Sequence, residues 1–234
     1  MSGDDPGILP RSLPTAPTAV PELLDRARAL AGRTLADIAK PLHLLVPPDL
    51  SRRKGWVGNL IEVALGASAG SKPTPDFERI GVELKTIPIG ANGTPRESTF
   101  VTHVAVDALS DMTWESSFVR AKLHRVLWVP IQADPKLPLA HRRVGMPLLW
   151  RCEGDDEQRI EADWQRLTDQ IRMGFIDSLT GSDGEILHMR PKALDRRETR
   201  PTVGEDGWLV QTLPRGFYLR ARFTAGLLAR HYAG

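Results

Sequence analysis

Apolar side chains recur at the three- to four-residue spacing of amphipathic helices in several parts of the chain. Pro21 suits the first position of one such helix. In the helix expected around Leu60, the stripe predicted to face the core is Trp56, Leu60, Val63 and Ala64. The spacing predicts helices over residues 21–31, 35–40, 55–66 and 157–173, and a helical stretch from Phe217 to the C-terminus.

Alternation of apolar and polar residues predicts strands between these helices. In residues 80–89 the alternation places Glu83 and Lys85 on one face of a strand and apolar side chains on the other. Further strands are expected over residues 98–106, 125–131 and 185–190. Since strands and helices are mixed along the chain, the fold class is α/β or α+β.

Two segments lack either pattern. Residues 1–17 are rich in Pro, Ser, Gly and Asp and are predicted to form a mobile tail. Residues 192–207 are charged and irregular, and we expect a mobile surface loop there. The remainder of the 234-residue chain, residues 18–234, is long enough for a single domain built from two lobes.

Composition narrows the class of protein only modestly. The formal net charge is +2, from 31 Lys and Arg against 29 Asp and Glu, so total charge does not by itself indicate a nucleic-acid partner. Cys152 is the sole cysteine, which excludes an internal disulfide and a cysteine metal cluster. The N-terminus lacks a secretory pattern, and no apolar run is long enough to span a membrane. We therefore expect a cytoplasmic protein that is not bound to membranes.

The sharpest local feature is a pair of acids with a lysine. Asp76 lies just before the predicted strand that carries Glu83 and Lys85. Two converging carboxylates suit a hard cation, Mg²⁺ above all. Such a cation polarises a phosphate oxygen, and a nearby lysine stabilises developing charge or orients the attacking water. The trio is therefore a candidate site for phosphodiester hydrolysis, although a Glu-x-Lys pair on a strand is more often a surface ion pair.

Glu62 is a third candidate acid. It lies within an apolar helical run, where a carboxylate would be costly to bury without a partner. Proximity to a metal ion would offset that cost. The alternative is that Glu62 lies on the solvent-exposed face of the helix, and the pattern leaves both interpretations open.

Five longer blocks of sequence are more specific than the short acidic motif: residues 54–89, 114–131, 141–150, 188–193 and 213–231. These blocks resemble the MutH family of DNA mismatch repair endonucleases. The resemblance extends in order over nearly the whole chain after the predicted tail. It implies a PD-(D/E)xK, restriction-endonuclease-like fold, in which a mixed sheet flanked by helices forms two arms around a DNA cleft.

The resemblance also implies a specific activity. It implies incision of double-stranded DNA at GATC sites, 5′ to the G, on the unmethylated strand. It implies Mg²⁺ as cofactor, with Mn²⁺ as a substitute, and activation by the ATPase MutL, which is recruited through the mismatch sensor MutS. Because one strand is cut at a time, we expect a monomer.

Residues of the catalytic centre are carried over position by position. The resemblance makes Asp76 and Glu83 metal ligands, together with the backbone carbonyl of Leu84, and makes Lys85 the catalytic lysine. Glu62 matches the helix acid that completes the acidic group. Lys122 matches a lysine near the catalytic centre. His124 stands where a second lysine is expected, which puts one phosphate contact in doubt.

Residues that contact DNA are carried over in the same way. Arg190 can donate two hydrogen bonds to a guanine edge, and Tyr218 matches the residue that senses adenine methylation. Phe100 matches an aromatic wedge that reaches toward the base stack, although an ordinary core role in a strand fits it equally. The remaining expected DNA contacts are Lys54 and Gly55 in one loop and Pro191 and Lys192 in another.

Other functions remain open from the residues alone. A restriction endonuclease of the same fold would cut both strands at GATC, a binding module would recognise GATC without cutting, and an adaptor would dock other repair proteins. The acid–lysine set argues against the last two, because neither needs converging carboxylates. Basic residues in segments 120–125 and 215–222 either neutralise DNA phosphates or form solvated surfaces.

Overall fold

The structure is a computed structural model that describes residues 13–51, 53–68, 74–192 and 199–232. Its longer helices are α1 (Val20–Leu30), α2 (Leu35–Ala39), α3 (Trp56–Leu65), α4 (Phe118–Leu123), α5 (Asp155–Arg172) and α6 (Ala221–Tyr232). Its strands are β1 (Glu83–Ile89), β2 (Thr99–His103), β3 (Arg125–Gln132), β4 (Leu148–Arg151), β5 (Leu187–Pro191), β6 (Arg200–Val203), β7 (Leu209–Thr212) and β8 (Arg215–Leu219). Within these ranges no helix has the length and apolar character needed to cross a membrane.

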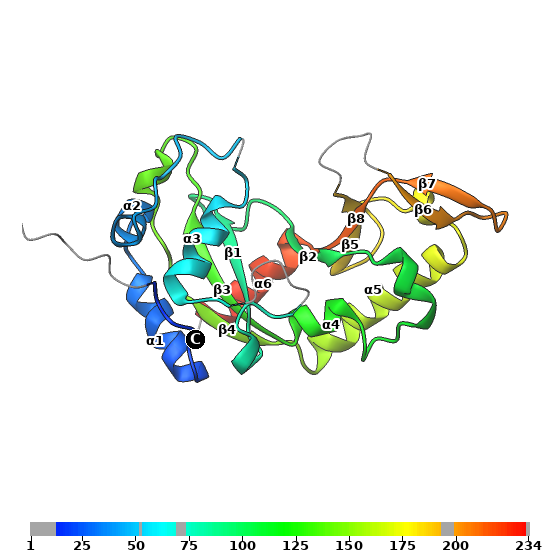
Figure 1. Ribbon diagram of the computed structural model, residues 1–234, viewed down its shortest axis with the longest axis horizontal. Helices are drawn as coiled ribbons and strands as arrows, with labels where there is room; N and C mark the ends of the chain where they lie inside the picture. Colours follow the sequence, from blue (N-terminus) through cyan, green and yellow to red (C-terminus); the bar gives the residue numbers. More distant parts are fainter. Residues whose placement is uncertain (1–12, 52, 69–73, 193–198, 233–234) are drawn as a thin grey trace, which may run out of the picture.

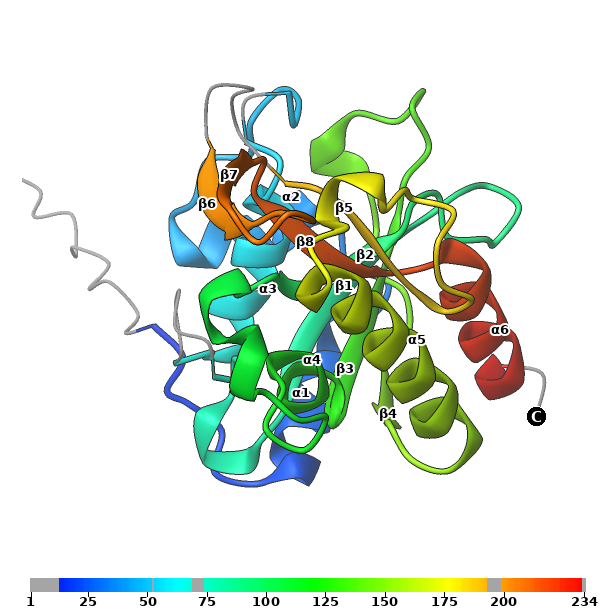
Figure 2. The same cartoon turned by 90° about the vertical axis from the view of Figure 1, so that its right-hand side faces the viewer.

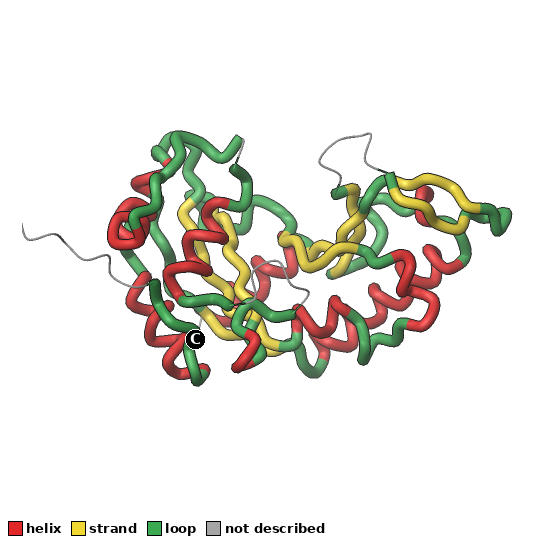
Figure 3. The backbone as a smooth tube through the Cα atoms, viewed as in Figure 1, coloured by secondary structure: helices red, strands yellow, loops and turns green. Residues whose placement is uncertain are grey.

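The strands form two three-stranded sheets and a hairpin. In the first sheet, with order β1-β3-β4, β1 pairs parallel to β3 and β3 pairs antiparallel to β4. The second sheet, β2-β8-β5, is antiparallel, and β6 pairs with β7 as a hairpin. Figure 1 shows α1, α2 and α3 beside the first sheet in one half of the molecule. The other half holds the second sheet with α5 along it, and the β6–β7 hairpin lies at its far end (Figures 1 and 3).

Two hydrophobic cores lie on opposite faces of the first sheet. Leu127 and Val129 of β3 belong to the core shared with α1, α2 and α3, whereas Val126 and Trp128 belong to the core shared with α5, α6 and the second sheet. Because both faces of β3 are covered, its sequence is almost continuously apolar rather than alternating. Seen from the side, α5 and α6 cover the face opposite to α1 (Figure 2).

The four predicted helices are confirmed within a few residues, but the buried stripe of α3 is different. Its buried side chains are Val57, Leu60, Ile61 and Leu65. Trp56, Val63 and Ala64 are only partly buried. The reason is that α3 packs against α1, α2 and β1 together. Its buried face is therefore rotated around the helix axis relative to the face expected for packing against one neighbour.

The C-terminal prediction is wrong over its first residues. Residues from Phe217 were expected to be helical, but Phe217 and Leu219 are buried in strand β8 and the helix begins at Ala221. The mixed sheet expected for this fold is also divided into two separate sheets. Strand β8 is the centre of the second sheet, and its Phe217 and Leu219 are buried in the core that the sheet shares with α5 and α6.

The two predicted mobile segments are partly structured. Of residues 192–207, the structure describes 192 and 199–207, and Arg200–Val203 forms strand β6, so the expected irregular loop is wrong there. Residues 193–198 lie outside the described residues. Of the predicted tail, residues 1–12 also lie outside them, while the carbonyl of Thr15 accepts a hydrogen bond of 2.6 Å from Arg26 Nη1.

The start of strand β5 is held by a buried acid of α5. Asp163 is 4% exposed, and its carboxylate accepts hydrogen bonds from the backbone N–H groups of Glu185, Ile186 and Leu187 at 2.6–2.9 Å. Arg166 also pairs with Asp163 at 2.8 Å. The carboxylate therefore satisfies main-chain donors that would otherwise be buried without partners.

We expect Asp163→Ala to lower the free energy of unfolding by about 3 kcal/mol or more, because it leaves several buried donors unsatisfied at about 1–3 kcal/mol each. Urea denaturation measures this change. Asp169→Ala on the same helix is the matched control, since Asp169 is exposed and pairs only with Arg172 among the described residues. A change within about 0.5 kcal/mol in both variants would contradict this role for Asp163.

Candidate active site

Glu83 is the most buried acid of the predicted trio. It is 2% exposed at the start of β1. Lys85 Nζ donates to Oε1 at 2.6 Å, and Lys122 Nζ donates to Oε2 at 2.9 Å. Lys85 reaches Glu83 because the two residues share a strand face, while Lys122 comes from α4 and also donates to the carbonyl of Thr74 at 2.6 Å. Both carboxylate oxygens are therefore paired with ammonium groups, as a buried charge requires.

Asp76 lies against the free edge of the same strand. Its Oδ2 accepts a hydrogen bond of 2.8 Å from the backbone N–H of Leu84. That edge of β1 is available because β3 pairs with the opposite edge. Burial raises the pKa of Asp76, the charge of Glu83 raises it further, and the hydrogen bond from Leu84 acts in the opposite direction. The two acids thus lie close enough to repel each other.

Glu62 approaches the group from helix α3. It is half-buried rather than on an exposed face, and a Cβ built on Gly58 would lie 3.9 Å from Glu62 Oε1 and 4.0 Å from Thr86 Oγ1 of β1. Burial raises the pKa of Glu62, and Asp76 raises it further, whereas Lys85 lowers it. The exposed alternative for Glu62 is therefore excluded by its position.

The acids and lysines form one electrostatic group around the start of β1. With all groups ionised, the carboxylates of Glu62, Asp76 and Glu83 and the ammonium groups of Lys85 and Lys122 sum to one net negative charge (−3 + 2). Among the described residues, no three acidic, histidine or cysteine side chains converge closely enough to hold a metal ion by themselves. A cation bound there would need further oxygen ligands from the main chain, water or substrate.

The predicted DNA-contacting aromatics meet on the second sheet. Phe100 of β2 lies opposite Tyr218 of β8, and their ring centroids are 5.3 Å apart at 66°. Lys192 Nζ lies 4.4 Å from the ring centroid of Phe100 and 6.0 Å from that of Tyr218. Arg190 Cζ lies 5.8 Å from the ring centroid of Tyr218. The structure therefore brings together four residues from three separate parts of the sequence.

Pro191 is part of a strand and not of a loop as expected. Strand β5 includes Arg190, in agreement with the strand predicted over 185–190, and ends at Pro191; the side chain of Arg190 is exposed, and Lys192 follows directly. On β8, Gly216 lies opposite Arg190, and a Cβ there would approach Phe100 Cε2 to 2.7 Å. Phe100 is half-buried because its ring lies over this glycine. The face needs glycine at position 216 for that close approach.

The other predicted contacts lie apart from this cluster. Lys54 and Gly55 are exposed directly before α3, and a Cβ on Gly55 would meet no protein atom within 4 Å. His124 is exposed at the C-terminal end of α4, where its carbonyl accepts a hydrogen bond of 3.2 Å from the N–H of Cys152.

Comparison with known proteins now identifies the family. The family described as "DNA mismatch repair enzyme MutH" matches residues 65–163. The "DNA mismatch repair protein MutH" of Yersinia enterocolitica is 51% identical over 222 residues, covering 94% of this chain and 97% of that protein. That of Klebsiella pneumoniae is 49% identical over 227 residues, covering 97% of both. The chain belongs to the MutH family. It therefore has a restriction-endonuclease-like fold and is a DNA endonuclease of mismatch repair.

In this MutH-family chain, most basic residues of the segments 120–125 and 215–222 form ion pairs or hydrogen bonds within the protein. Arg120 pairs with Glu157 at 3.1 Å, and Lys122 pairs with Glu83. Arg215 pairs with Asp177 at 2.9 Å. The other arginines in these segments donate to main-chain carbonyls: Arg125, Arg220 and Arg222. They brace the fold, so they are neither purely solvated nor held ready for phosphate.

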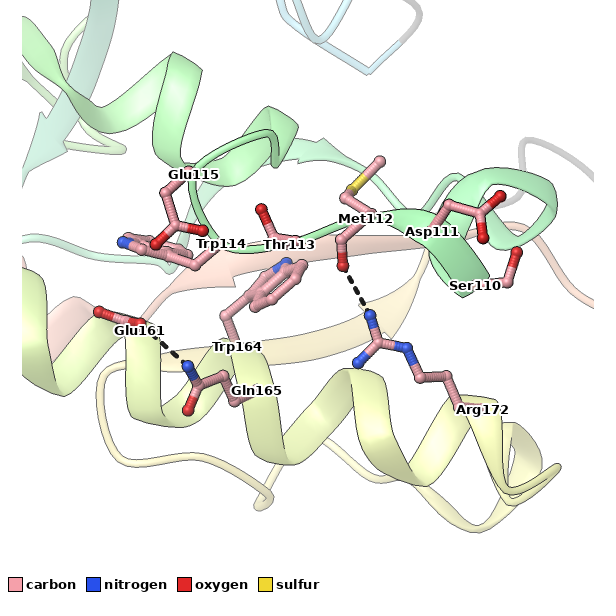
Figure 4. A pocket seen from close by; sticks show the side chains of 10 residues that line it. All are labelled: Ser110, Asp111, Met112, Thr113, Trp114, Glu115, Glu161, Trp164, Gln165 and Arg172. Carbon is pink, nitrogen blue, oxygen red and sulfur yellow. Dashed lines mark hydrogen bonds between the residues drawn. The ribbon is translucent and has the colours of Figure 1, made fainter.

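A pocket of about 380 Å³ lies elsewhere on the MutH fold, between the segment Ser110–Glu115 and helix α5 (Figure 4). Arg172 closes one side by donating to the carbonyl of Met112 at 2.7 Å. The residues that line it include none of the predicted catalytic or DNA-contacting residues.

Sequence reasoning did not identify two neighbours of the aromatic cluster. His188 lies opposite Tyr218 in β5, with ring centroids 6.0 Å apart, and Gly216 lies under Phe100. A signal for His188 was present, because it alternates with Arg190 in the predicted strand over 185–190. For Gly216 no signal distinguished it from a turn glycine.

Proposed function

We propose that the chain is a methyl-directed mismatch repair endonuclease that nicks the unmethylated strand 5′ to the G of GATC sites. The observation that carries the proposal is the buried acid–lysine group at the start of β1 in a chain of the MutH family. A restriction enzyme that cuts both strands is the second candidate of the same fold, but the relatives' names and the length of the match favour mismatch repair.

Mg²⁺ is the proposed cofactor, and the residues present fit it. When bound, it would polarise a phosphate oxygen and lower the pKa of a coordinated water. Asp76 and Glu83 offer carboxylate oxygens, and burial together with the charge of Glu83 raises the pKa of Asp76, two costs of its charged form that a bound cation would offset. Mg²⁺ in proteins commonly takes one or two carboxylates and completes its shell with water and substrate phosphate. Mn²⁺ accepts the same oxygen ligands and is the proposed substitute.

The main-chain carbonyl of Leu84 and the carboxylate of Glu62 complete the proposed metal centre. In an extended strand the N–H and C=O of one residue point toward the same edge, so the carbonyl of Leu84 faces the edge where its N–H meets Asp76. This supports Leu84 as a ligand. Glu62, set back on α3, would contribute directly or through a water molecule.

The two lysines have different proposed roles. Lys122 is anchored by both Glu83 and the carbonyl of Thr74, so it holds the Glu83 carboxylate in place. Lys85 is paired with Glu83 alone among the described residues, so it is free to exchange that contact for the attacking water or the developing phosphate charge.

The second sheet is the proposed DNA-reading face. Exposed Arg190 would donate two hydrogen bonds to a guanine, and Tyr218 would distinguish the amino group of adenine from a methylamino group. Phe100 is the proposed wedge toward the base stack. Lys192 and Pro191 would lie against the backbone at the end of β5.

The loop before α3 is proposed to approach the DNA backbone as well. Lys54 is exposed there, and the open space around Gly55 means that packing within the protein does not require glycine at that position. The loss of lysine at position 124 leaves an exposed imidazole that can still donate a hydrogen bond.

The remaining proposals rest on the family. Residues 18–234 act as a single endonuclease domain of two lobes, as a monomer in the cytoplasm. Its partner proteins are MutL, which activates incision, and MutS, which acts through MutL. Cutting one strand at a time requires one catalytic centre, which supports the monomer.

The proposed function is tested with Mg²⁺ and plasmids that carry unmethylated, hemimethylated or fully methylated GATC sites. We expect nicking of the unmethylated strand on the first two and none on the third, because Tyr218 excludes the modified adenine. Gel mobility of nicked against linear plasmid separates this from the restriction alternative. Equally fast cutting of fully methylated plasmid would contradict methylation sensing.

The metal assignment is tested by Asp76→Ala and Glu83→Ala. Each should reduce the nicking rate by at least about 100-fold, because a ligand to a cation that supplies several kcal/mol is lost. Binding to the same DNA without metal should remain. Asp107→Asn, which changes an exposed acid in the 3-10 helix Val106–Asp111, is the control. Nicking at the rate of the unmodified protein in either alanine variant would refute the site.

Base readout is tested by Arg190→Ala and Arg190→Lys. Both should reduce the preference for GATC over a site with one substituted G by about tenfold or more, because a good bidentate contact contributes about 1–3 kcal/mol of discrimination. Lysine keeps the charge but not the two-donor geometry, so only alanine should also weaken binding to all sequences. Cutting rates on matched plasmids measure the preference, and an unchanged preference in both variants would rule out this reading role.

A further inference from the structure

Tyr218 is held between two other rings on the second sheet. β8 is the central strand, so Tyr218 has Phe100 of β2 on one side and His188 of β5 on the other. Phe100 makes an edge contact with Tyr218 at 5.3 Å and 66°, and His188 makes one at 6.0 Å and 65°. The direction of the tyrosine ring is therefore set by its two cross-strand neighbours.

His188 is itself fixed in one orientation. It is 4% exposed, and Nδ1 lies 2.9 Å from the carbonyl oxygen of Gly181. A carbonyl only accepts, so Nδ1 carries the proton and donates. Burial lowers the pKa of His188, the bond to Gly181 opposes this, and nearby Arg220 and Arg190 lower it further. The ring is accordingly neutral with a single tautomer.

The carbonyl that holds His188 belongs to a braced segment. Thr180 and Asp183 hydrogen-bond to each other at either side of Gly181, with distances of 2.7 and 2.9 Å. Arg220 Nε donates to the carbonyl of Gly184 at 2.9 Å. Asp163 holds the N–H groups that follow. These hydrogen bonds hold the carbonyl of Gly181 in place, so the carbonyl orients the ring of His188.

Packing alone does not account for a histidine at this position. Its Nε2 is buried without a hydrogen-bond partner among the residues that the structure describes. A buried acceptor without a partner lowers stability, and an apolar side chain of similar volume would avoid that cost. Because Nδ1 is bonded to the carbonyl of Gly181, the histidine supplies a rigid ring edge in a fixed direction, which an aliphatic side chain cannot.

We propose that His188 is a positioning residue for methylation discrimination: its anchored ring edge sets the Tyr218 ring where unmodified adenine fits and N6-methyladenine does not. The proposal rests on the proposed function, in which Tyr218 meets adenine. An N6 methyl group needs space of its own, so discrimination depends on where the tyrosine ring lies. His188 acts only through Tyr218, because its own Nε2 is buried.

Three substitutions separate the ring edge from the hydrogen bond. His188→Asn keeps a donor for Gly181 without a ring, and His188→Leu fills the space without a ring or a polar atom. His188→Phe keeps a ring edge without the donor. His188→Leu removes the unpartnered nitrogen, so it provides a folded ring-free variant if the asparagine variant is unstable. The matched control is His231→Asn, which removes the edge contact of His231 with Tyr232 at 5.0 Å on α6.

The first measurement is binding of the purified full chain, without metal, to duplexes with unmethylated or fully methylated GATC. In His188→Asn and His188→Leu the preference for the unmethylated duplex should fall about three- to tenfold, the range expected for loss of an aromatic edge contact. His188→Phe and His231→Asn should keep most of it. Affinity for a duplex without GATC should be unchanged in all four, which a general loss of structure would not allow.

The second measurement observes the ring directly. The chain has two tyrosines, so tyrosine-labelled protein has ring NMR signals from Tyr218 and Tyr232 alone. His188→Asn and His188→Leu should shift the Tyr218 signals and leave those of Tyr232 in place, and His231→Asn should do the reverse. These shifts test the contact between the two rings independently of DNA, and the binding measurement tests its effect on discrimination.

The outcomes separate this proposal from the one on which it rests. Absence of any methylation preference in the unmodified protein overturns the proposed function and this inference together. A preserved preference in both ring-free variants, or unshifted Tyr218 signals in them, overturns the role of His188 while leaving the proposed function intact. Equal loss in His188→Phe would also overturn it, because the ring edge would then not be the determinant.

Discussion

The burial of the Glu83 carboxylate between two lysines constrains much of the surrounding structure. Removing a carboxylate from water costs several kcal/mol, and only close, well-directed cations offset that cost. Lys85 comes from the same strand, but Lys122 comes from α4, so α4 must lie against the start of β1. Thr74 is drawn to the same point because its carbonyl accepts from Lys122. The segment Thr74–Asp76 is thereby fixed beside Leu84.

Pairing of charges within the protein also accounts for much of its basic content, although the formal net charge is only +2. Most arginines in the basic segments are engaged by carboxylates or carbonyls of the protein, as Arg215 is by Asp177. The cations left for DNA on the second sheet are few, and Arg190 and Lys192 lie over aromatic rings. A cation–π contact at an exposed site contributes only about 0.5–1 kcal/mol. Such contacts orient the two cations and are weak enough to be exchanged for stronger hydrogen-bond acceptors.

The parts of this structure that sequence could predict are those whose signal is local. Helix α5 is long and periodic, and Asp76, Glu83 and Lys85 lie within one short stretch. Strand β8 was missed because its five residues are separated from α6 by Arg220 alone, so strand and helix patterns merge in one window. The β6–β7 hairpin was missed because its apolar residues Leu209 and Val210 are exposed, whereas its buried side chains include the polar Thr202 and Thr212.

Contacts across the chain account for the rest. Lys122 is 39 residues from Glu83, and a spacing argument cannot join them; only the family resemblance did. The position of His188 behind Tyr218 depends on the register of β5 against β8, which a shift of one residue would reverse. Register is a property of the assembled sheet, so neither spacing nor composition contains it.

The acid–lysine group and the aromatic cluster of the second sheet are joined by a common core. Ile87, on the same face of β1 as Glu83 and Lys85, belongs to the core that also contains Met189 of β5 and Phe217 of β8. Trp128 of β3 lies in that core as well. Close-packed interiors deform little, so a core shared in this way holds the two faces at a fixed separation. The core of α1, α2 and α3 lies on the other face of the first sheet and includes Phe77 and Leu84, so it supports Asp76 as well as Glu62. The positions of Asp76, Glu83 and Lys85 relative to Tyr218 therefore depend on apolar residues of the shared core, such as Ile87 and Trp128.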